Sequence, residues 1–306
     1  MIDELISRIT ELNNPTAVGL DTSFDYLPEE EKKSCKTLSD AAKAITEFNY
    51  TLIDRLHKLV PSVKVQVAYY EKYGVAGMQA FSDTLSAAKK AGLITIADCK
   101  RNDIGSTAAC YSAAYLGRVN VGEYEFSPFE CDFLTVNGYL GSDGLDPFVA
   151  DCVKYNKGIF VLVKTSNPSS GQLQDKKFED GRTLYEHAAT LVTECGKPLV
   201  GKYGYSAVGA VIGATHPAQA EDVRKKYPSL FFLIPGYGAQ GGSADGLTVC
   251  FDDRGLGGIV NNSRGIICAY KSEKYKGQTY AQAAENAVID MREDIYRALK
   301  KAGKAK

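Results

Sequence analysis

Residues 93–108 read Leu-Ile-Thr-Ile-Ala-Asp-Cys-Lys-Arg-Asn-Asp-Ile-Gly-Ser-Thr-Ala. The first five residues are apolar or β-branched, which is typical of a buried strand, and charged residues follow where that strand ends. Side chains alternate along a strand, so we expect Asp98 and Lys100 on the same face. Asp103 lies beyond the strand and must come from the following loop or from the first turn of the next helix.

Short runs rich in Val and Ile recur along the whole chain, and stretches with helical periodicity separate them. The predicted strands are residues 16–21, 63–68, 93–98, 133–137, 159–164, 208–214, 230–235 and 258–262. The predicted helices are residues 38–59, 73–91, 104–116, 146–155, 184–195, 217–227 and 280–299. This alternation predicts a parallel sheet that closes into a (β/α)₈ TIM barrel, with a doubly wound open sheet as the alternative. We expect residues 1–306 to form a single domain.

Composition narrows the class of protein. A net charge of −1 over 306 residues gives no electrostatic argument for binding nucleic acid or an anionic membrane, so a small-molecule partner is expected. Eight cysteines occur without a C-x-x-C pair, which favours reduced thiols and a cytoplasmic protein. We expect no signal peptide and no membrane span, because the first residues lack a basic and apolar leader and no apolar run reaches about 18 residues.

The predicted barrel has a functional consequence, because active sites of this fold lie at the C-terminal ends of the strands. Polar residues gather at those ends in this chain. Examples are Asp21, Lys64, Asp98, Lys100, the segment Lys164-Thr165-Ser166, and Arg264. Two long polar connections, residues 167–182 and 236–254, are expected to be lids or binding elements, or plain surface insertions.

The charged residues restrict the chemistry. A lysine flanked by carboxylates is expected to stay protonated, so Lys100 would act as an acid and not as a Schiff-base nucleophile. A structural ion-pair network at the rim is the alternative. Lys164-Thr165-Ser166 resembles the Schiff-base lysine segment of deoxyribose-phosphate aldolases, but over three residues only. No paired histidines support a zinc site, whereas carboxylates could still hold magnesium.

The residues that follow the seventh and eighth predicted strands indicate a phosphate-binding site. Residues 236–242 form a glycine-rich segment with free backbone N–H groups, and Gln240 adds a side-chain donor. Arg264 follows the eighth strand with a guanidinium suited to two hydrogen bonds with an oxyanion. Barrels commonly bind phosphate with the loops after strands seven and eight.

Residues 98–107 resemble the D-x-K-x-x-D-I-G-x-T signature of orotidine 5′-phosphate decarboxylases. Residues 19–21, 64–66, 164–168 and 235–240 and Arg264 agree with that family in order and placement. The Lys-Thr-Ser-Asn-Pro element and the longer loops are most similar to the longer, type 2 subgroup. The resemblance covers nearly the whole chain.

This resemblance implies a carboxy-lyase that converts orotidine 5′-phosphate to uridine 5′-phosphate (UMP) and CO₂, the last step of de novo pyrimidine synthesis, with no cofactor and no metal. Lys100 would stabilise the charge that develops at C6 and then protonate that carbon. Asp98 would lie beside the departing carboxylate, and Lys64 would orient Asp98 and reach the ribose.

The resemblance also implies an obligate homodimer with shared active sites. Asp103 would enter the site of the neighbouring subunit, and Ile104 and Thr107 of that subunit would border the ribose. The remaining substrate contacts would be Asp21 to the ribose hydroxyls, Ser166 to the pyrimidine edge, Pro235 to the ring, and Gln240 and Arg264 to the 5′-phosphate.

Two other functions stay open. Sugar-phosphate enzymes on the same barrel, such as hexulose-phosphate synthase, share D-x-K-x-x-D and would use it to hold magnesium. A catalytically dead nucleotide-binding barrel would be expected to lack Lys100 or Asp98, and both are present.

Overall fold

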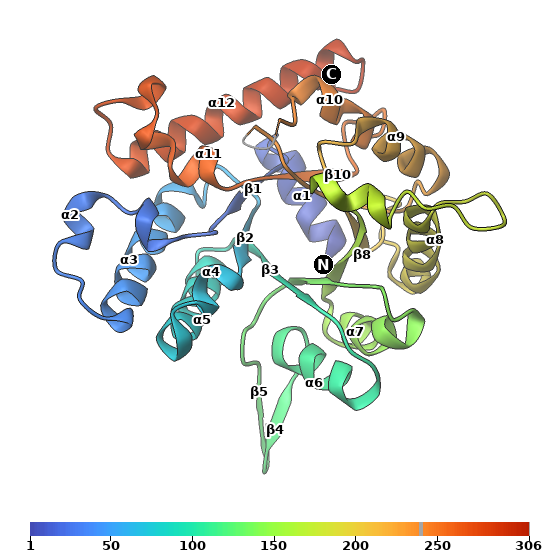
Figure 1. Cartoon of the computed structure of the whole chain (residues 1–306), viewed down its shortest axis with the longest axis horizontal. Helices are drawn as coiled ribbons and strands as arrows, with labels where there is room; N and C mark the ends of the chain where they lie inside the picture. The colour runs from blue at the N-terminus through green and yellow to red at the C-terminus, as the bar shows by residue number, and fades with distance from the viewer. Residues whose placement is uncertain (239–240, 306) are drawn as a thin grey trace.

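The computed structural model describes residues 1–238 and 241–305, and its described part contains a closed barrel of parallel strands (Figure 1). The barrel strands are β1 (Thr16–Gly19), β2 (Ser62–Gln66), β3 (Ile94–Arg101), β6 (Phe133–Val136), β7 (Gly158–Lys164), β8 (Val208–Ile212), β9 (Phe232–Pro235) and β10 (Gly258–Asn262). Neighbours in this order pair with each other, and β10 pairs with β1 to close the ring. The predicted TIM barrel is confirmed, and the open-sheet alternative is wrong because no barrel strand is left at an edge.

Helices surround the barrel on its outer side (Figure 1). The longer ones are α3 (Leu38–Leu56), α5 (Gly74–Lys90), α6 (Gly105–Tyr115), α7 (Ser142–Tyr155), α8 (Leu184–Gly196), α9 (Pro217–Lys226) and α12 (Tyr280–Lys301). Each of them overlaps a predicted helix. The short helices are α2 (Glu29–Lys32), α4 (Ala68–Glu71), α10 (Ala244–Leu247) and α11 (Arg264–Ile267). Threonine capping boxes fix the first turns of α3, α8 and α12. None of the described helices is long and apolar enough to cross a membrane.

One end of the barrel is closed by α1 (Ile2–Leu12), which the sequence analysis did not predict. Its buried side chains Ile2, Leu5, Ile6 and Ile9 belong to the same apolar cluster as residues inside the barrel, among them Ile96, Phe133, Phe160 and Leu233. In Figure 1 the helix lies behind the strands. Because apolar side chains fill the barrel at this end, a polar cavity is expected at the other one, where the strands have their C-terminal ends.

A second unpredicted feature is a hairpin that projects away from the barrel beside α6 (Figure 1). Its strands are β4 (Val119–Val121) and β5 (Tyr124–Phe126). Val119 pairs with Phe126 and Val121 with Tyr124, so these four apolar side chains share one face of the hairpin. They are between 38% and 72% exposed.

Candidate active site

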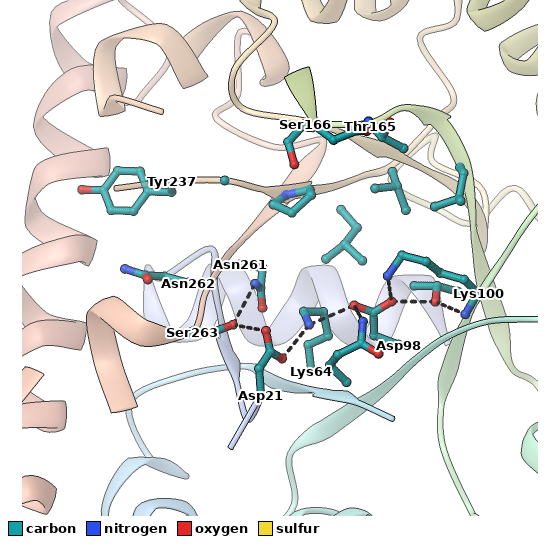
Figure 2. A pocket seen from close by; sticks show the side chains of 18 of the residues that line it. Asp21, Lys64, Asp98, Lys100, Thr165, Ser166, Tyr237, Asn261, Asn262 and Ser263 are labelled. Carbon is teal, nitrogen blue, oxygen red and sulfur yellow. Dashed lines mark hydrogen bonds and ion pairs between the residues drawn. The ribbon is translucent and has the colours of Figure 1, made fainter. Parts of the chain in front are cut away.

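A cavity of about 720 Å³ opens at the C-terminal ends of the barrel strands. Figure 2 shows a row of alternating charges, Asp21, Lys64, Asp98 and Lys100, with Ser166 on the opposite side of the cavity. Nζ of Lys64 lies 2.9 Å from Oδ1 of Asp21 and 3.0 Å from Oδ2 of Asp98. Nζ of Lys100 lies 2.7 Å from Oδ1 of Asp98. The row therefore holds two ammonium groups around one buried carboxylate.

The two middle members of this row are less exposed to solvent than Lys100 at its end. The side chains of Lys64 and Asp98 are only 4% and 9% exposed, whereas that of Lys100 is 46% exposed. Lys64 is thus fixed between two carboxylates. Lys100 is the most exposed member of the row and can meet a ligand in the cavity.

A β-bulge turns Lys100 into the cavity. The pairing of β3 with β6 shifts register between Ala97 and Arg101, and Lys100 has a left-handed backbone with φ of 48°. Asp98 and Lys100 do approach each other as expected, but strand alternation alone is not the reason.

Charge outweighs burial in setting the protonation of the row. Burial alone would raise the pKa of the Asp98 carboxyl, but the charges and hydrogen bonds of Lys64 and Lys100 bring it well below its usual value. Burial would lower the pKa of Lys64, but Asp21 and Asp98 together raise it above its usual value. Asp98 is therefore an anion and Lys64 a cation at neutral pH.

Two uncharged side chains complete the hydrogen bonding of Asp98. Nε2 of Gln66 donates to Oδ2 across 3.0 Å, and Oγ1 of Thr135 donates to Oδ1 across 2.9 Å. Each carboxylate oxygen of Asp98 thus accepts two hydrogen bonds. Gln66 and Thr135 were not among the predicted site residues, although both lie near predicted strand ends.

Asp21 is oriented by Ser263, a further residue that the predicted site did not include. Oγ of Ser263 donates to Oδ2 of Asp21 across 2.7 Å, and Nδ2 of Asn261 lies 3.4 Å from that hydroxyl. The approach requires Gly19, because a Cβ at that position would lie 1.9 Å from Oγ of Ser263. The first and last strands therefore meet at this point in a contact that only glycine permits.

The opposite wall of the cavity is formed by the ends of β7 and β9. Ser166 and Pro235 line it, as the predicted pyrimidine contacts should, together with Thr165 and Tyr237. The Tyr237 hydroxyl points away from the cavity and donates to Oδ2 of Asp294 in α12 across 2.6 Å (Figure 2). This bond ties the start of the glycine-rich segment to the last helix.

The phosphate prediction is only partly covered by the described residues. Arg264, the first residue of α11, lines the cavity. Gly236, which follows β9, lines it as well. Arg264 forms no ion pair with any residue that the structure describes, so its guanidinium is available to a ligand. Gln240 lies outside the described residues, and its predicted contact with phosphate stays a prediction.

Three predicted site residues do not line the cavity of their own chain. Asp103, Ile104 and Thr107 lie at the start of α6, and the exposed side chain of Ile104 retains 54% of its accessible surface. Oδ1 of Asp103 accepts a hydrogen bond of 2.8 Å from the backbone of Ile104. This placement leaves them free to meet another subunit, which is the role that the sequence analysis assigned to them.

Lys164, the possible Schiff-base lysine, is fully buried and lies outside the cavity lining. Its Nζ contacts Oδ1 of Asp175 at 2.7 Å. The histidines are also outside the lining, with His216 forming a 3.3 Å contact to Ser170. Among the described residues no group of three acidic, histidine or cysteine side chains is arranged to hold a metal ion.

The fold and this site define a β/α-barrel enzyme whose cavity combines a buried lysine–carboxylate row with an arginine that forms no ion pair with the described residues. A model of the orotidine 5′-phosphate decarboxylase / HUMPS family matches residues 33–277, and the chain belongs to this family. A Rhodopirellula baltica protein named orotidine 5′-phosphate decarboxylase is 45% identical over 298 residues, covering 95% of this chain and 97% of the relative. One of the same name from Petrotoga mobilis is 41% identical, with 96% and 98% of the two chains covered.

A solved structure agrees with the sequence relatives. The Leishmania donovani OMP decarboxylase superposes with a TM-score of 0.71 at 28% identity, and the match covers 97% of both chains. The resemblance found in the signature of residues 98–107 is therefore confirmed at the level of the family and of the barrel.

Proposed function

We propose that this protein decarboxylates orotidine 5′-phosphate to UMP and CO₂ without a cofactor. The observation that carries the proposal is the row in which Lys64 and Lys100 flank the buried Asp98 at 3.0 and 2.7 Å. Loss of CO₂ from C6 leaves an electron pair on that carbon, and a fixed ammonium group can stabilise the developing charge. Relatives with 38–45% identity over nearly the whole chain carry this enzyme's name.

In the proposed reaction the bond between C6 and the carboxylate breaks, and its electron pair stays on C6. Lys100 stabilises that pair and transfers a proton from Nζ to C6, which yields UMP. Asp98 lies beside the departing carboxylate and holds Lys100 in position, while Lys64 holds Asp98. Because the Lys100 side chain is 46% exposed, solvent can return its proton after product release.

The cavity offers a matching surface for the rest of the substrate. Asp21 would accept hydrogen bonds from the ribose hydroxyls, next to Lys64. Ser166 and Pro235 would contact the pyrimidine from the opposite wall, and Arg264 would bind the 5′-phosphate together with Gln240. These assignments are the ones that the family resemblance implies, and all of these residues except Gln240, which lies outside the described residues, line the cavity.

We also propose a homodimer with shared active sites. Asp103, Ile104 and Thr107 do not line the cavity of their own chain, and Ile104 is exposed. The helix that they begin, α6, also exposes small apolar residues such as Ala109 and Cys110, which suits coverage by a second subunit. All eight cysteines lie in the described part of the chain and are unpaired, which fits the proposed cytoplasmic location.

The magnesium-dependent alternative needs the carboxylates of the signature to converge on a cation. Of these, Asp98 instead binds the ammonium groups of Lys64 and Lys100, at 3.0 and 2.7 Å, and Asp103 does not line the cavity with it. The space that a metal ion would need is thus taken by a side chain, and the donor set favours the cofactor-free reaction.

The test follows the loss of orotate absorbance when orotidine 5′-phosphate is added, with and without EDTA. We expect the absorbance to fall at the same rate in both samples. No change in absorbance would refute the proposal. A decrease that EDTA abolishes would instead support a metal-dependent enzyme.

A further inference from the structure

Thr135 joins the two central residues of the row through a single oxygen atom. Its Oγ1 donates a hydrogen bond of 2.9 Å to Oδ1 of Asp98 and accepts one of 2.9 Å from the backbone N–H of Lys100. The side chain comes from β6 and is only 1% exposed. A hydroxyl has only one hydrogen to donate. Because the N–H of Lys100 can only donate and the Asp98 carboxylate can only accept, the Thr135 hydroxyl must accept from the first and donate to the second.

The β-bulge explains why this hydroxyl is needed. On β6, Leu134 pairs with Ala97 and the next paired residue, Val136, lies opposite Arg101. Thr135 thus faces the segment between Ala97 and Arg101, where the strand ladder is interrupted. The N–H of Lys100 lies in that gap, is partly buried, and finds its acceptor in a side chain, the hydroxyl of Thr135.

The backbone conformation of Lys100 increases this dependence. A non-glycine residue with φ of 48° is unfavourable unless its surroundings hold it there. The direction of the Lys100 side chain, and with it the 2.7 Å contact to Asp98, follows from this backbone. The hydroxyl of Thr135 therefore acts on both partners of that contact, one through its carboxylate and the other through its backbone.

We propose that Thr135 is a positioning residue that sets the place of the Lys100 ammonium group relative to Asp98, and so the rate of the reaction. This inference rests on the proposed decarboxylation. Thr135 acts through the other two residues and has no step of its own. A displacement of a reacting group by about 1 Å can cost on the order of 100-fold in rate.

The chain offers a matched control at the other end of the barrel. Oγ1 of Thr95 donates to Oδ2 of Asp132 across 3.1 Å and accepts a 3.1 Å bond from the backbone N–H of the same aspartate. Thr95 is 0% exposed and does not line the cavity. Thr95→Val therefore removes the same kind of buried bond as Thr135→Val, but away from the site.

The experiment compares wild type, Thr135→Val, Thr135→Ser and Thr95→Val by urea unfolding and by steady-state kinetics across pH. We expect Thr135→Val to lower kcat on the order of 10- to 100-fold with a smaller change in KM, and to change the pH profile of kcat. Thr135→Ser keeps the hydroxyl and should recover most of kcat. Thr95→Val should lose similar stability yet keep kcat within about twofold, because its bond is remote from the reacting groups.

A second measurement does not depend on turnover. The NMR chemical shift of the Lys100 ε-carbon, assigned with Lys100→Arg, should move in Thr135→Val and return toward wild type in Thr135→Ser. If wild type fails to consume orotidine 5′-phosphate, the proposed function fails, and the NMR result still decides the positioning role. Equal kcat in Thr135→Val and Thr95→Val, or an unchanged Lys100 signal, would overturn the inference.

Discussion

Lys164 is fully buried, and its Nζ lies 2.7 Å from Oδ1 of Asp175. The lysine ends β7, whereas the aspartate belongs to the long connection that follows this strand. The neighbouring Gln174 accepts a 3.0 Å bond from the N–H of Thr165 and donates a 2.8 Å bond to its hydroxyl. The connection is thus attached to the barrel at residues 174–175, next to the wall that should read the pyrimidine. Lys164 therefore anchors the connection to the barrel. The role of this second strand-end lysine is structural and not that of a nucleophile.

Asp175→Asn should destabilise the protein and raise KM for orotidine 5′-phosphate more than it lowers kcat. The change leaves the Lys164 ammonium buried without its counter-charge, at a cost of about 1–3 kcal/mol, reduced from the usual range because the Asp175 side chain is 41% exposed. Urea unfolding and steady-state kinetics measure both effects. Asp180→Asn, in the same connection, removes an exposed ion pair with Arg182 and should change neither quantity. Equal effects of the two variants would contradict the anchoring role.

Lys100→Ala should abolish turnover while UMP still binds. The variant lacks the proton donor, which alone accounts for about 10²- to 10⁴-fold in rate, and also the cation that stabilises the charge at C6. Contacts to the ribose and phosphate remain, so calorimetry should give a Kd for UMP close to that of wild type. Lys90→Ala, at the exposed end of α5, serves as the control and should leave kcat unchanged. A Lys100→Ala enzyme with kcat within about tenfold of wild type would be incompatible with the proposed mechanism.

Asp98 should make folding stability depend on pH in the acid range. Its pKa in the folded protein lies below the unfolded value of about 3.9, so its contribution is fully present above that value and is lost as pH falls through the folded pKa. Wild type should therefore exceed Asp98→Asn in its free energy of unfolding at pH 7, and the difference should shrink below about pH 4. Urea unfolding at several pH values measures this difference. A constant difference between pH 7 and pH 3 would show that the Asp98 charge is not what stabilises the site.

The barrel and its charged row were predictable because both follow local patterns. Each strand is an apolar run followed by polar residues, and parallel strands bring those polar ends to one rim. This alone placed Lys64, Asp98 and Lys100 together. Helix α1 was missed although its apolar face has a helical period, because it precedes the first strand and the alternation of strands and helices gives no reason to expect a helix there.

The supporting residues could not be predicted in the same way. Thr135 and Ser263 act on residues that are 35 to 242 positions away in the chain, through one hydroxyl each. A β-branched threonine within an apolar run is an ordinary strand residue, so the sequence does not reveal a special role for it. Its hydroxyl can bond to the neighbouring strand only because the register of that strand shifts opposite it. Gly19 is likewise an ordinary strand-end residue in the sequence, and only the structure shows that the close approach of Ser263 requires a glycine there.

Arg264→Ala should weaken catalysis only for substrates that carry the phosphate. A charge-assisted hydrogen bond contributes about 1.5–3 kcal/mol, so kcat/KM for orotidine 5′-phosphate should fall roughly 10- to 100-fold. Binding energy from the remote phosphate can also help to order the reacting groups, so part of the loss should appear in kcat. Orotidine, which lacks the phosphate, is the matched control and should react equally slowly with both enzymes. A similar relative loss with orotidine would place the effect of Arg264 outside phosphate binding.

Mixing two inactive variants should restore activity if each site draws on both subunits. Lys100→Ala damages the site of its own chain, whereas Asp103→Ala should damage the site of the partner, because Asp103 does not line the cavity of its own chain. A mixed dimer then has one site with both defects and one intact site. After unfolding and refolding together, about a quarter of the wild-type activity per chain is expected, since half of randomly formed dimers are mixed.

The control pairs two variants whose defects belong to the same site. Lys64 and Lys100 line one cavity, so Lys64→Ala and Lys100→Ala leave no intact site in a mixed dimer, and refolding them together should restore nothing. Sedimentation of each refolded mixture verifies that dimers have formed. Recovery with Asp103→Ala but not with Lys64→Ala would assign Asp103 to the partner's site. If neither mixture regains activity although dimers are present, Asp103 acts within its own subunit, and the exposed start of α6 must have a different function.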